Sequence, residues 1–378
     1  MRTLFCMLFV LPCLFACAHG YSAGAYAVLD AGTGAILDSA NADARLPMAS
    51  TTKIMTGLLA AEDGSPERMI SVPASCAGVE GSSMYLQAGE VLPLRDVLYG
   101  LMLCSGNDAA ECIAAVCGGR DAFVRRMNRR AGQLGLTNTH FDNPSGLDGE
   151  THYTTAAELA KLTAYALRNP LFAEVVSTQS YQTGTRTMHN HNKLLSLYPG
   201  CIGVKTGYTQ TAGRCLVSAA ERNGHTVIAV TLNDGDDWND HMAMLDAAFA
   251  SEHTETLAAH GQQAAVLPVI SGTQSTVSAV FSEDLPVSLL GDQTASVVLS
   301  HRGMLYAPVT AGTVCGRADV VVGGTVVASC DLITSSAVPP DETQEILSLW
   351  ERLRRRFSPE SALSIAQSGG KRKEDHAR

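Results

Sequence analysis

Residues 49–53 read Ala-Ser-Thr-Thr-Lys, and an apolar run over residues 54–61 follows them directly. Ser50 and Lys53 are three residues apart, so on a helix both side chains lie on one face, about one turn from each other. A serine hydroxyl is a poor nucleophile until a nearby base takes its proton. A lysine amine that is partly dry and close to other cations can be that base. The apolar run would bury the helix and so dry the lysine.

The same stretch also fits a simpler interpretation. Ser50 can be the N-cap of a helix, since serine is common at that position. A Ser-x-x-Lys tetrapeptide is expected by chance about once in a chain of this length and ordinary composition. On these residues alone the helix cap is favoured, and a nucleophilic Ser50 needs the support of further motifs later in the chain.

The second motif is Ser105-Gly106-Asn107. Apolar residues recur at helical spacing from Leu94 to Met102, and a new helix is expected from Asp108. The tripeptide therefore lies on a corner between two helices, where short polar side chains can point into a cleft on rigid supports. Serine and asparagine are also ordinary helix caps, so this motif alone leaves both interpretations open.

The third motif, Lys205-Thr206-Gly207, lies on a strand predicted over residues 202–209. Gly203 and Gly207 remove side chains from this strand, which indicates that it runs close to another part of the chain. Two further strands are expected over residues 216–220 and 227–232, on either side of an Asn-Gly turn, and a helix over residues 238–249.

Three such motifs in this order, on a helix start, a helix corner and a strand, are specific together. The chain resembles the penicillin-binding and β-lactamase superfamily, and within it the low-molecular-mass D-alanyl-D-alanine carboxypeptidases of peptidase family S11. The resemblance covers residues 24–250 well and residues 260–336 more weakly. It implies an α/β fold of the transpeptidase type, an antiparallel sheet with helices on both sides, followed by a small all-β domain.

The resemblance also implies a site and a reaction. Ser50 would attack the carbonyl between two D-alanines and form an acyl-enzyme, Lys53 would take its proton, and Ser105 would relay a proton to the leaving amine. Substrate binding would fall to Asn107, Lys205, Thr206, Gly207 and Tyr208. The backbone N–H groups of Ser50 and Tyr208 would form the oxyanion hole. The implied partners are the D-Ala-D-Ala end of a peptidoglycan stem peptide and, as covalent inhibitors, β-lactams.

One position departs from the pattern. Some carboxypeptidases of this family carry arginine where this chain has His191, which leaves the second contact to the substrate carboxylate open. Arg214 is an alternative candidate, on its proximity to the predicted strand.

Two other functions compete with the carboxypeptidase. A class A β-lactamase carries Glu-x-x-x-Asn between the second and third motifs, and none of the glutamates between Ser105 and Lys205 has asparagine four residues on. A non-catalytic module that only holds the cell wall is disfavoured, because every polar side chain that the reaction needs is present.

Charge and ligand patterns exclude further classes. The formal net charge is −10 at pH 7, which disfavours nucleic-acid binding through phosphate neutralisation. His189 and His191 alternate as strand neighbours would, but no third ligand lies near them in sequence and no Cys-x-x-Cys pair is present. We therefore expect neither a metal nor a cofactor.

The amino-terminal segment is expected to direct export. Residues 1–18 combine a positive start, a short apolar run and a final Ala-Cys-Ala, which predicts a secretory signal cleaved before His19. A lipoprotein cleavage box at residues 14–17 is the alternative. The catalytic domain is then expected over residues 19–255.

The carboxyl-terminal part is expected to hold two further segments. A β-rich domain is predicted over residues 256–336, where Cys315 and Cys330 either pair or remain free thiols. In residues 337–378, an amphipathic helix over residues 345–357 with tryptophan and clustered arginines precedes a basic tail. This helix suits a membrane surface, and docking on its own protein is the alternative. The sequence thus predicts an exported enzyme at the outer face of the cytoplasmic membrane.

Overall fold

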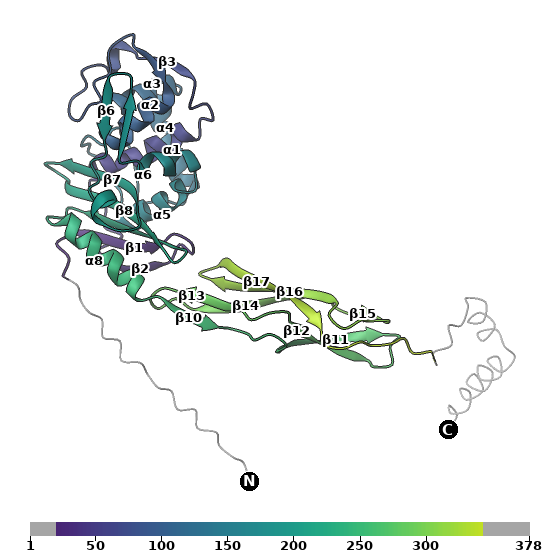
Figure 1. Ribbon diagram of the computed structural model, residues 1–378. Coiled ribbons are helices and arrows are strands. Elements are labelled where there is room, and N and C mark those ends of the chain that lie inside the picture. Colours follow the sequence, from purple (N-terminus) through teal and green to yellow (C-terminus); the bar gives the residue numbers. More distant parts are fainter. Residues whose placement is uncertain (1–19, 343–378) are drawn as a thin grey trace, which may run out of the picture. The chain divides into compact units, whose positions relative to one another are not determined.

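The structure is a computed structural model that describes residues 20–342, so the predicted signal segment and the 345–357 helix lie outside the described residues. The chain divides into two compact units (Figure 1). The first holds residues 20–255 together with Val287–Ser296 and Val321–Val327. The second holds Thr256–Pro286, Val297–Val320 and residues 328–342.

A five-stranded antiparallel sheet forms the centre of the first unit, in the order β2-β1-β9-β8-β7. Its strands are β1 (Ala25–Asp30), β2 (Ile36–Ala40), β7 (Cys201–Thr209), β8 (Gly213–Arg222) and β9 (His225–Leu232). Strand β1 is buried along its whole length, because its alternate side chains enter two different cores. Strand β7 is an edge strand, so one of its two long edges has no strand beside it in this sheet.

Helices cover both faces of this sheet, as predicted. Helix α8 (Asp237–Ala250) packs with Tyr26 and Val28 on one face. On the other face lie α5 (Ala156–Ala166), α6 (Pro170–Ser177) and the fully buried α1 (Lys53–Ala61). Local sequence sets these boundaries: Thr155 caps α5 by accepting a hydrogen bond from the Glu158 N–H at 3.2 Å.

The remaining elements belong wholly or mostly to the first unit. They are η1 (Ala49–Thr52), β3 (Met69–Ser71), η2 (Ala74–Cys76), β4 (Val91–Pro93), α2 (Leu94–Leu103), α3 (Asn107–Val116), α4 (Arg120–Gln133), β5 (Ser180–Thr183), β6 (Arg186–His189), α7 (Leu194–Leu197), β10 (His253–Thr256) and β13 (Pro286–Leu289). The predicted corner between two helices is present, with α2 and α3 on either side of residues 104–106.

The second part of the chain is all-β, as predicted. A six-stranded sheet has the order β14-β16-β17-β12-β11-β15. Its strands are β11 (Gln263–Ile270), β12 (Thr276–Phe281), β14 (Ala295–His301), β15 (Leu305–Tyr306), β16 (Val314–Val322) and β17 (Thr325–Thr334). Cys315 and Cys330 are both buried and free, so of the two alternatives it is the free thiols that the structure contains.

Candidate active site

Ser50 and Lys53 meet at the junction of η1 and α1. Ala49 has a positive φ of 46°, a backbone conformation that costs energy for a residue with a side chain and is often found at functional sites. It starts the tight η1 turn that leads directly into α1. Across this turn, Nζ of Lys53 lies 2.8 Å from Oγ of Ser50. The predicted pair is therefore in hydrogen-bonding contact.

The environment of Lys53 favours an uncharged amine. The side chain is fully buried, and its pKa is well below the ordinary value, chiefly because burial penalises the charged form and secondarily because Lys205 is nearby. The carboxylates of Asp108 and Glu111 oppose this shift. As an uncharged amine, Nζ donates its two N–H groups to Oδ1 of Asn107 at 2.8 Å and to the Ser145 carbonyl oxygen at 2.5 Å, which leaves its lone pair to accept from the Ser50 hydroxyl.

The side chains of the Ser105–Asn107 corner lie beside Ser50 and Lys53. Ser105 has a φ of 57° and turns the chain sharply between α2 and α3. The Asn107 side chain is oriented from both ends, since Oδ1 accepts from Lys53 and Nδ2 donates to the Glu80 carbonyl at 2.6 Å. Its backbone N–H donates to the Ser82 carbonyl at 2.7 Å.

Strand β7 passes directly against the nucleophile turn. A Cβ atom placed on Gly207 would lie 3.0 Å from the backbone nitrogen of Ser50, and one on Gly203 would lie 2.9 Å from Cγ2 of Val176. The prediction that these glycines permit close approach is thus confirmed. Lys205 on this strand is buried, which lowers its pKa to about 7, and its Nζ donates to the Thr206 carbonyl at 2.9 Å.

One open pocket joins the three motifs. Its lining residues are Ser50, Ser82, Ser105, His191, Thr206, Gly207, Tyr208, Arg214, Asp237 and Trp238. Lys53, Asn107 and Lys205 are buried and do not line it, whereas Tyr208 is 66% exposed. All eight predicted site residues therefore belong to one location in the fold.

The two candidates for the second carboxylate contact both line this pocket. Burial and the nearby Lys205 lower the pKa of His191 below its ordinary value, so its imidazole is uncharged at neutral pH. Arg214 donates to the Asp237 carboxylate at 2.5 Å and lies over the Trp238 ring at 5.7 Å. Arg214 is therefore the better placed cation for an anionic substrate group.

Sequence reasoning missed two parts of the site. The Ser145 carbonyl contacts Lys53, and Ser82 lines the pocket. A backbone carbonyl has no signature in the residue type that carries it. The one available signal was the glycine after Ser145: Gly146 has a φ of 93°, and a Cβ atom there would lie 2.0 Å from the Ala49 carbonyl oxygen.

Potential metal ligands do not gather in the described part of the chain. Residues 20–342 contain no group of three or more histidine, cysteine, aspartate or glutamate side chains arranged to hold a metal ion. His189 lies at the end of β6, and His191 lines the catalytic pocket.

Comparisons with known families and relatives agree with one another. A family model described as D-alanyl-D-alanine carboxypeptidase matches residues 16–236, and a model of the penicillin-binding protein 5 C-terminal domain matches residues 253–340. The D-alanyl-D-alanine carboxypeptidase DacF of Bacillus subtilis (strain 168) is 32% identical over 320 residues, or 80% of this chain and 82% of the relative. DacA of Escherichia coli (strain K12) is 27% identical over 339 residues, 84% of each chain.

Solved structures lead to the same group. Penicillin-binding protein 5 from Haemophilus influenzae superposes with a TM-score of 0.63 at 26% identity, covering 84% of this chain and 98% of that protein. The Streptomyces K15 DD-transpeptidase superposes with a TM-score of 0.58 at 33% identity, covering 60% of this chain and 96% of that protein.

Proposed function

The chain belongs to the D-alanyl-D-alanine carboxypeptidase family of serine peptidases, with a penicillin-binding-protein-like fold, and we propose that it works through an acyl-enzyme on Ser50. Its substrate is the D-Ala-D-Ala end of a peptidoglycan stem peptide. The observation that supports this proposal most directly is the 2.8 Å contact between Oγ of Ser50 and a fully buried amine of lowered pKa.

Acylation needs a base, an oxyanion hole and an acid. Lys53 takes the Ser50 proton while Oγ attacks the carbonyl carbon of the penultimate D-alanine. The backbone N–H groups of Ser50 and Tyr208 stabilise the oxyanion, and the closeness of β7 to the nucleophile turn supports this pairing. The C–N bond then breaks, Ser105 relays the proton held by Lys53 to the leaving amine, and D-alanine departs, which returns Lys53 to its uncharged form.

Deacylation returns the enzyme to its starting state. Water attacks the ester carbonyl, its proton goes to Lys53, and the ester C–O bond breaks. Lys53 then gives this proton to Oγ of Ser50, and the shortened stem leaves. Asn107 holds Lys53 during both steps and offers its amide to the stem.

The terminal carboxylate of the substrate is recognised by residues on β7 and β8. Thr206 and Arg214 line the pocket, and the buried Lys205 keeps the potential there positive. We assign to Arg214 the contact that an arginine at the position of His191 would otherwise make. Gly207 leaves room for the stem to lie beside β7 as an additional strand.

Release of D-alanine from a diacyl-D-alanyl-D-alanine peptide tests this function. We expect release by the intact chain and none by Ser50→Ala, together with covalent labelling by a fluorescent penicillin that the same substitution abolishes. A chain that neither frees D-alanine nor takes the label would be a non-catalytic module. Fast turnover of the penicillin instead would support a β-lactamase.

We propose that the enzyme acts outside the cytoplasm, on the wall side of the membrane. The family's substrate belongs to the cell wall, and residues 1–18 have the pattern of an export signal. None of the helices within residues 20–342 is long and apolar enough to cross a bilayer. Contact with the membrane surface is assigned to the segment over residues 345–357 on its sequence pattern alone.

A further inference from the structure

The loop from Asp142 to His152 brings a backbone carbonyl to the catalytic lysine. The Ser145 carbonyl oxygen lies 2.5 Å from Nζ of Lys53, and the neighbouring Pro144 carbonyl accepts from Oγ1 of Thr56 on α1 at 2.7 Å. The proposed reaction does not account for what holds this loop against the nucleophile turn.

His152 closes the loop at its foot and is almost completely buried. The backbone N–H of Asp142 donates to its Nδ1 at 3.0 Å, so Nδ1 carries no proton in the uncharged ring. The proton is then on Nε2, which donates to Oγ1 of Thr52 at 2.7 Å. Thr52 lies between Ser50 and Lys53, and its own hydroxyl donates to the Ala49 carbonyl at 2.8 Å.

The imidazole is uncharged at any pH at which the enzyme would work. Burial lowers its pKa to about 4. Of the charged and titratable groups that face it, Asp142 and Asp148 act to raise this pKa, whereas His140 and Lys53 act to lower it. The tautomer set by the Asp142 N–H is therefore maintained at neutral pH.

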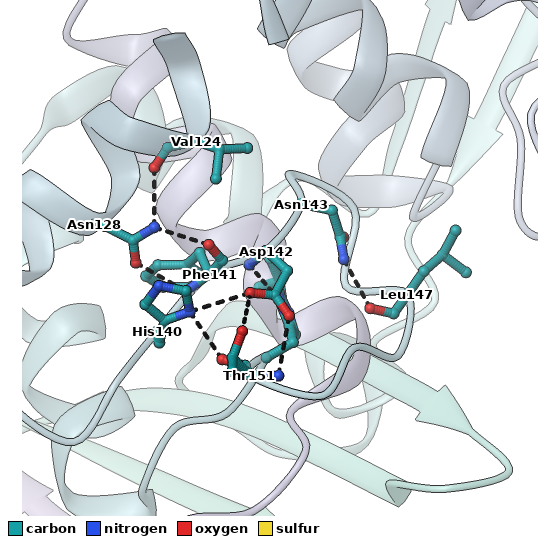
Figure 2. Close-up of polar contacts among 10 residues, drawn as sticks. Val124, Asn128, His140, Phe141, Asp142, Asn143, Leu147 and Thr151 are labelled. Atoms are coloured by element: carbon teal, nitrogen blue, oxygen red, sulfur yellow. Dashed lines mark hydrogen bonds and ion pairs between the residues drawn. The ribbon is translucent and has the colours of Figure 1, made fainter. Parts of the chain in front are cut away.

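Hydrogen bonds within the loop hold the rest of its backbone in place. Figure 2 shows the polar contacts around its start, made by Asn128, His140, Phe141, Asp142, Asn143, Leu147 and Thr151. The Asp142 carboxylate accepts from the N–H of Thr151 at 3.2 Å and from its hydroxyl at 2.6 Å. Oδ1 of Asn143 accepts from the backbone N–H groups of Ser145 and Gly146, which fixes the direction of the intervening carbonyl.

We propose that His152 is a positioning residue for the catalytic base: its imidazole ties both ends of the loop to Thr52 and so holds the Ser145 carbonyl against the amine of Lys53. This inference rests on the proposed role of Lys53. The ring is suited to the task because one edge accepts and the opposite edge donates a hydrogen bond. An amide side chain can offer the same two functions, whereas an aliphatic side chain offers neither.

His152→Leu and His152→Gln separate positioning from packing, and the readout is acylation by a fluorescent penicillin. We expect His152→Leu to lower the limiting acylation rate constant about 10-fold or more, the loss expected for one or two hydrogen bonds, with little change in the dissociation constant of the non-covalent complex. His152→Gln should recover most of the rate.

The pH profile provides a second readout. A loosened loop admits water to Lys53 and weakens the burial that lowers its pKa, while Lys205, Asp108 and Glu111 still face the amine. The acid limb of the acylation rate should therefore move to higher pH in His152→Leu. If His152 served only packing, the substitution would leave the acid limb of the acylation rate at its wild-type pH.

His241 offers a matched control. It is also fully buried, its ring nitrogens lie 2.6 Å from Oγ of Ser218 and 3.0 Å from Oγ1 of Thr231, and it is not among the residues that line the pocket. His241→Leu should lower the thermal midpoint comparably and leave the acylation rate and its pH profile at wild-type values. Equal losses in both leucine variants, or a wild-type rate in His152→Leu, would overturn the proposal.

Thr52→Val keeps the inference testable if His152→Leu does not fold, since it removes the other end of the 2.7 Å hydrogen bond at constant shape. We expect the same loss of acylation rate, and a wild-type rate would count against the proposal. Failure of the proposed function looks different, because the wild-type chain would then not be acylated, or Ser50→Ala still would be.

Discussion

At the scale of single residues, the site depends on the absence of side chains as much as on their presence. Gly207 allows β7 to approach the nucleophile turn, because a Cβ atom there would lie 3.0 Å from the Ser50 nitrogen and 3.1 Å from the Thr51 nitrogen. Both are backbone atoms, which cannot move aside as the end of a flexible side chain can. Strand and turn would have to separate to accommodate any larger residue.

We predict that Gly207→Ala lowers the rate of penicillin acylation at least about 100-fold, because displacing the strand removes an aligned oxyanion donor. The matched control is Gly132→Ala, at a helical position on α4 with no atom within 4 Å of the added methyl group. That variant should acylate normally and gain about 0.5–1 kcal/mol of stability. Acylation by Gly207→Ala at the wild-type rate would refute the close packing of β7.

The two buried amines should affect the kinetics at opposite ends of the pH range: Lys53 limits the acylation rate at low pH, and Lys205 limits substrate binding at high pH. Lys53 acts uncharged, so acylation should fall as the pH drops through its lowered pKa. Lys205 assists carboxylate binding as a cation, so KM should rise as the pH increases through about 7 in the free enzyme. Measured across about pH 5 to pH 10, a KM that does not depend on pH would contradict the role given to Lys205.

Burial of Lys205 also has a cost for folding. Its pKa of about 7 lies below the unfolded value of 10.5, so the folded chain binds fewer protons between these values and stability rises with pH there. Lys205→Met should therefore stabilise the fold by roughly 1–3 kcal/mol at neutral pH while abolishing carboxypeptidase activity. Chemical denaturation monitors the first effect, and a destabilised variant would argue against a costly buried amine.

At the scale of elements, one carboxylate at the start of α3 holds residues 80–86, the segment that carries the pocket residue Ser82. Asp108 accepts from Oγ of Ser83 at 2.6 Å, from the Met84 N–H at 3.0 Å and from the Leu86 N–H at 2.9 Å. Because it is itself buried, the carboxylate leaves these donors without partners when it is removed.

Asp108→Ala should thus cost roughly 2–3 kcal/mol of stability. The exposed Asp121→Ala on α4 is the control and should stay within about 0.5 kcal/mol of wild type. Urea unfolding monitored by circular dichroism would measure both. Similar values for the two variants would show that residues 80–86 are held by other contacts.

Most of this architecture could be predicted from periodicity and turn chemistry. The α2–α3 corner and the strands β7, β8 and β9 lie where the spacing of apolar residues and the Asn-Gly turn predict them. Within the predicted β-rich domain, strand β15 ends at Tyr306, shortly before Pro308, which has no N–H to donate. Strand β13 was missed, since four residues of mixed polarity have too little periodicity to detect.

The candidate site likewise contains features that the sequence predicts and features that it does not. Ser50, Lys53 and Asn107 were predictable because their chemistry resides in side chains whose spacing carries the signal. The Ser145 carbonyl and the positive φ of Ala49 were not, because they depend on how segments distant in the sequence pack against each other.

At the scale of the whole molecule, the end of the all-β part determines where the carboxyl-terminal segment begins. Val338 pairs with Val309, and the Asp341 N–H donates to the Ser271 carbonyl at 2.9 Å, so the chain is tied to the fold up to this point. Everything that the sequence assigns to the membrane surface lies beyond it, with the apolar face and arginines over residues 345–357.

Deleting residues 341–378 should therefore move the enzyme from the membrane fraction to the soluble fraction without loss of penicillin labelling. Replacing Arg352, Arg354, Arg355 and Arg356 by glutamate within the full chain tests the electrostatic part, since each basic residue near an anionic surface contributes about 1 kcal/mol. This variant should detach at physiological salt. If the shortened chain remains with the membrane, a lipid-modified amino terminus becomes the better explanation, because the residues that bind the surface would then have been removed without effect.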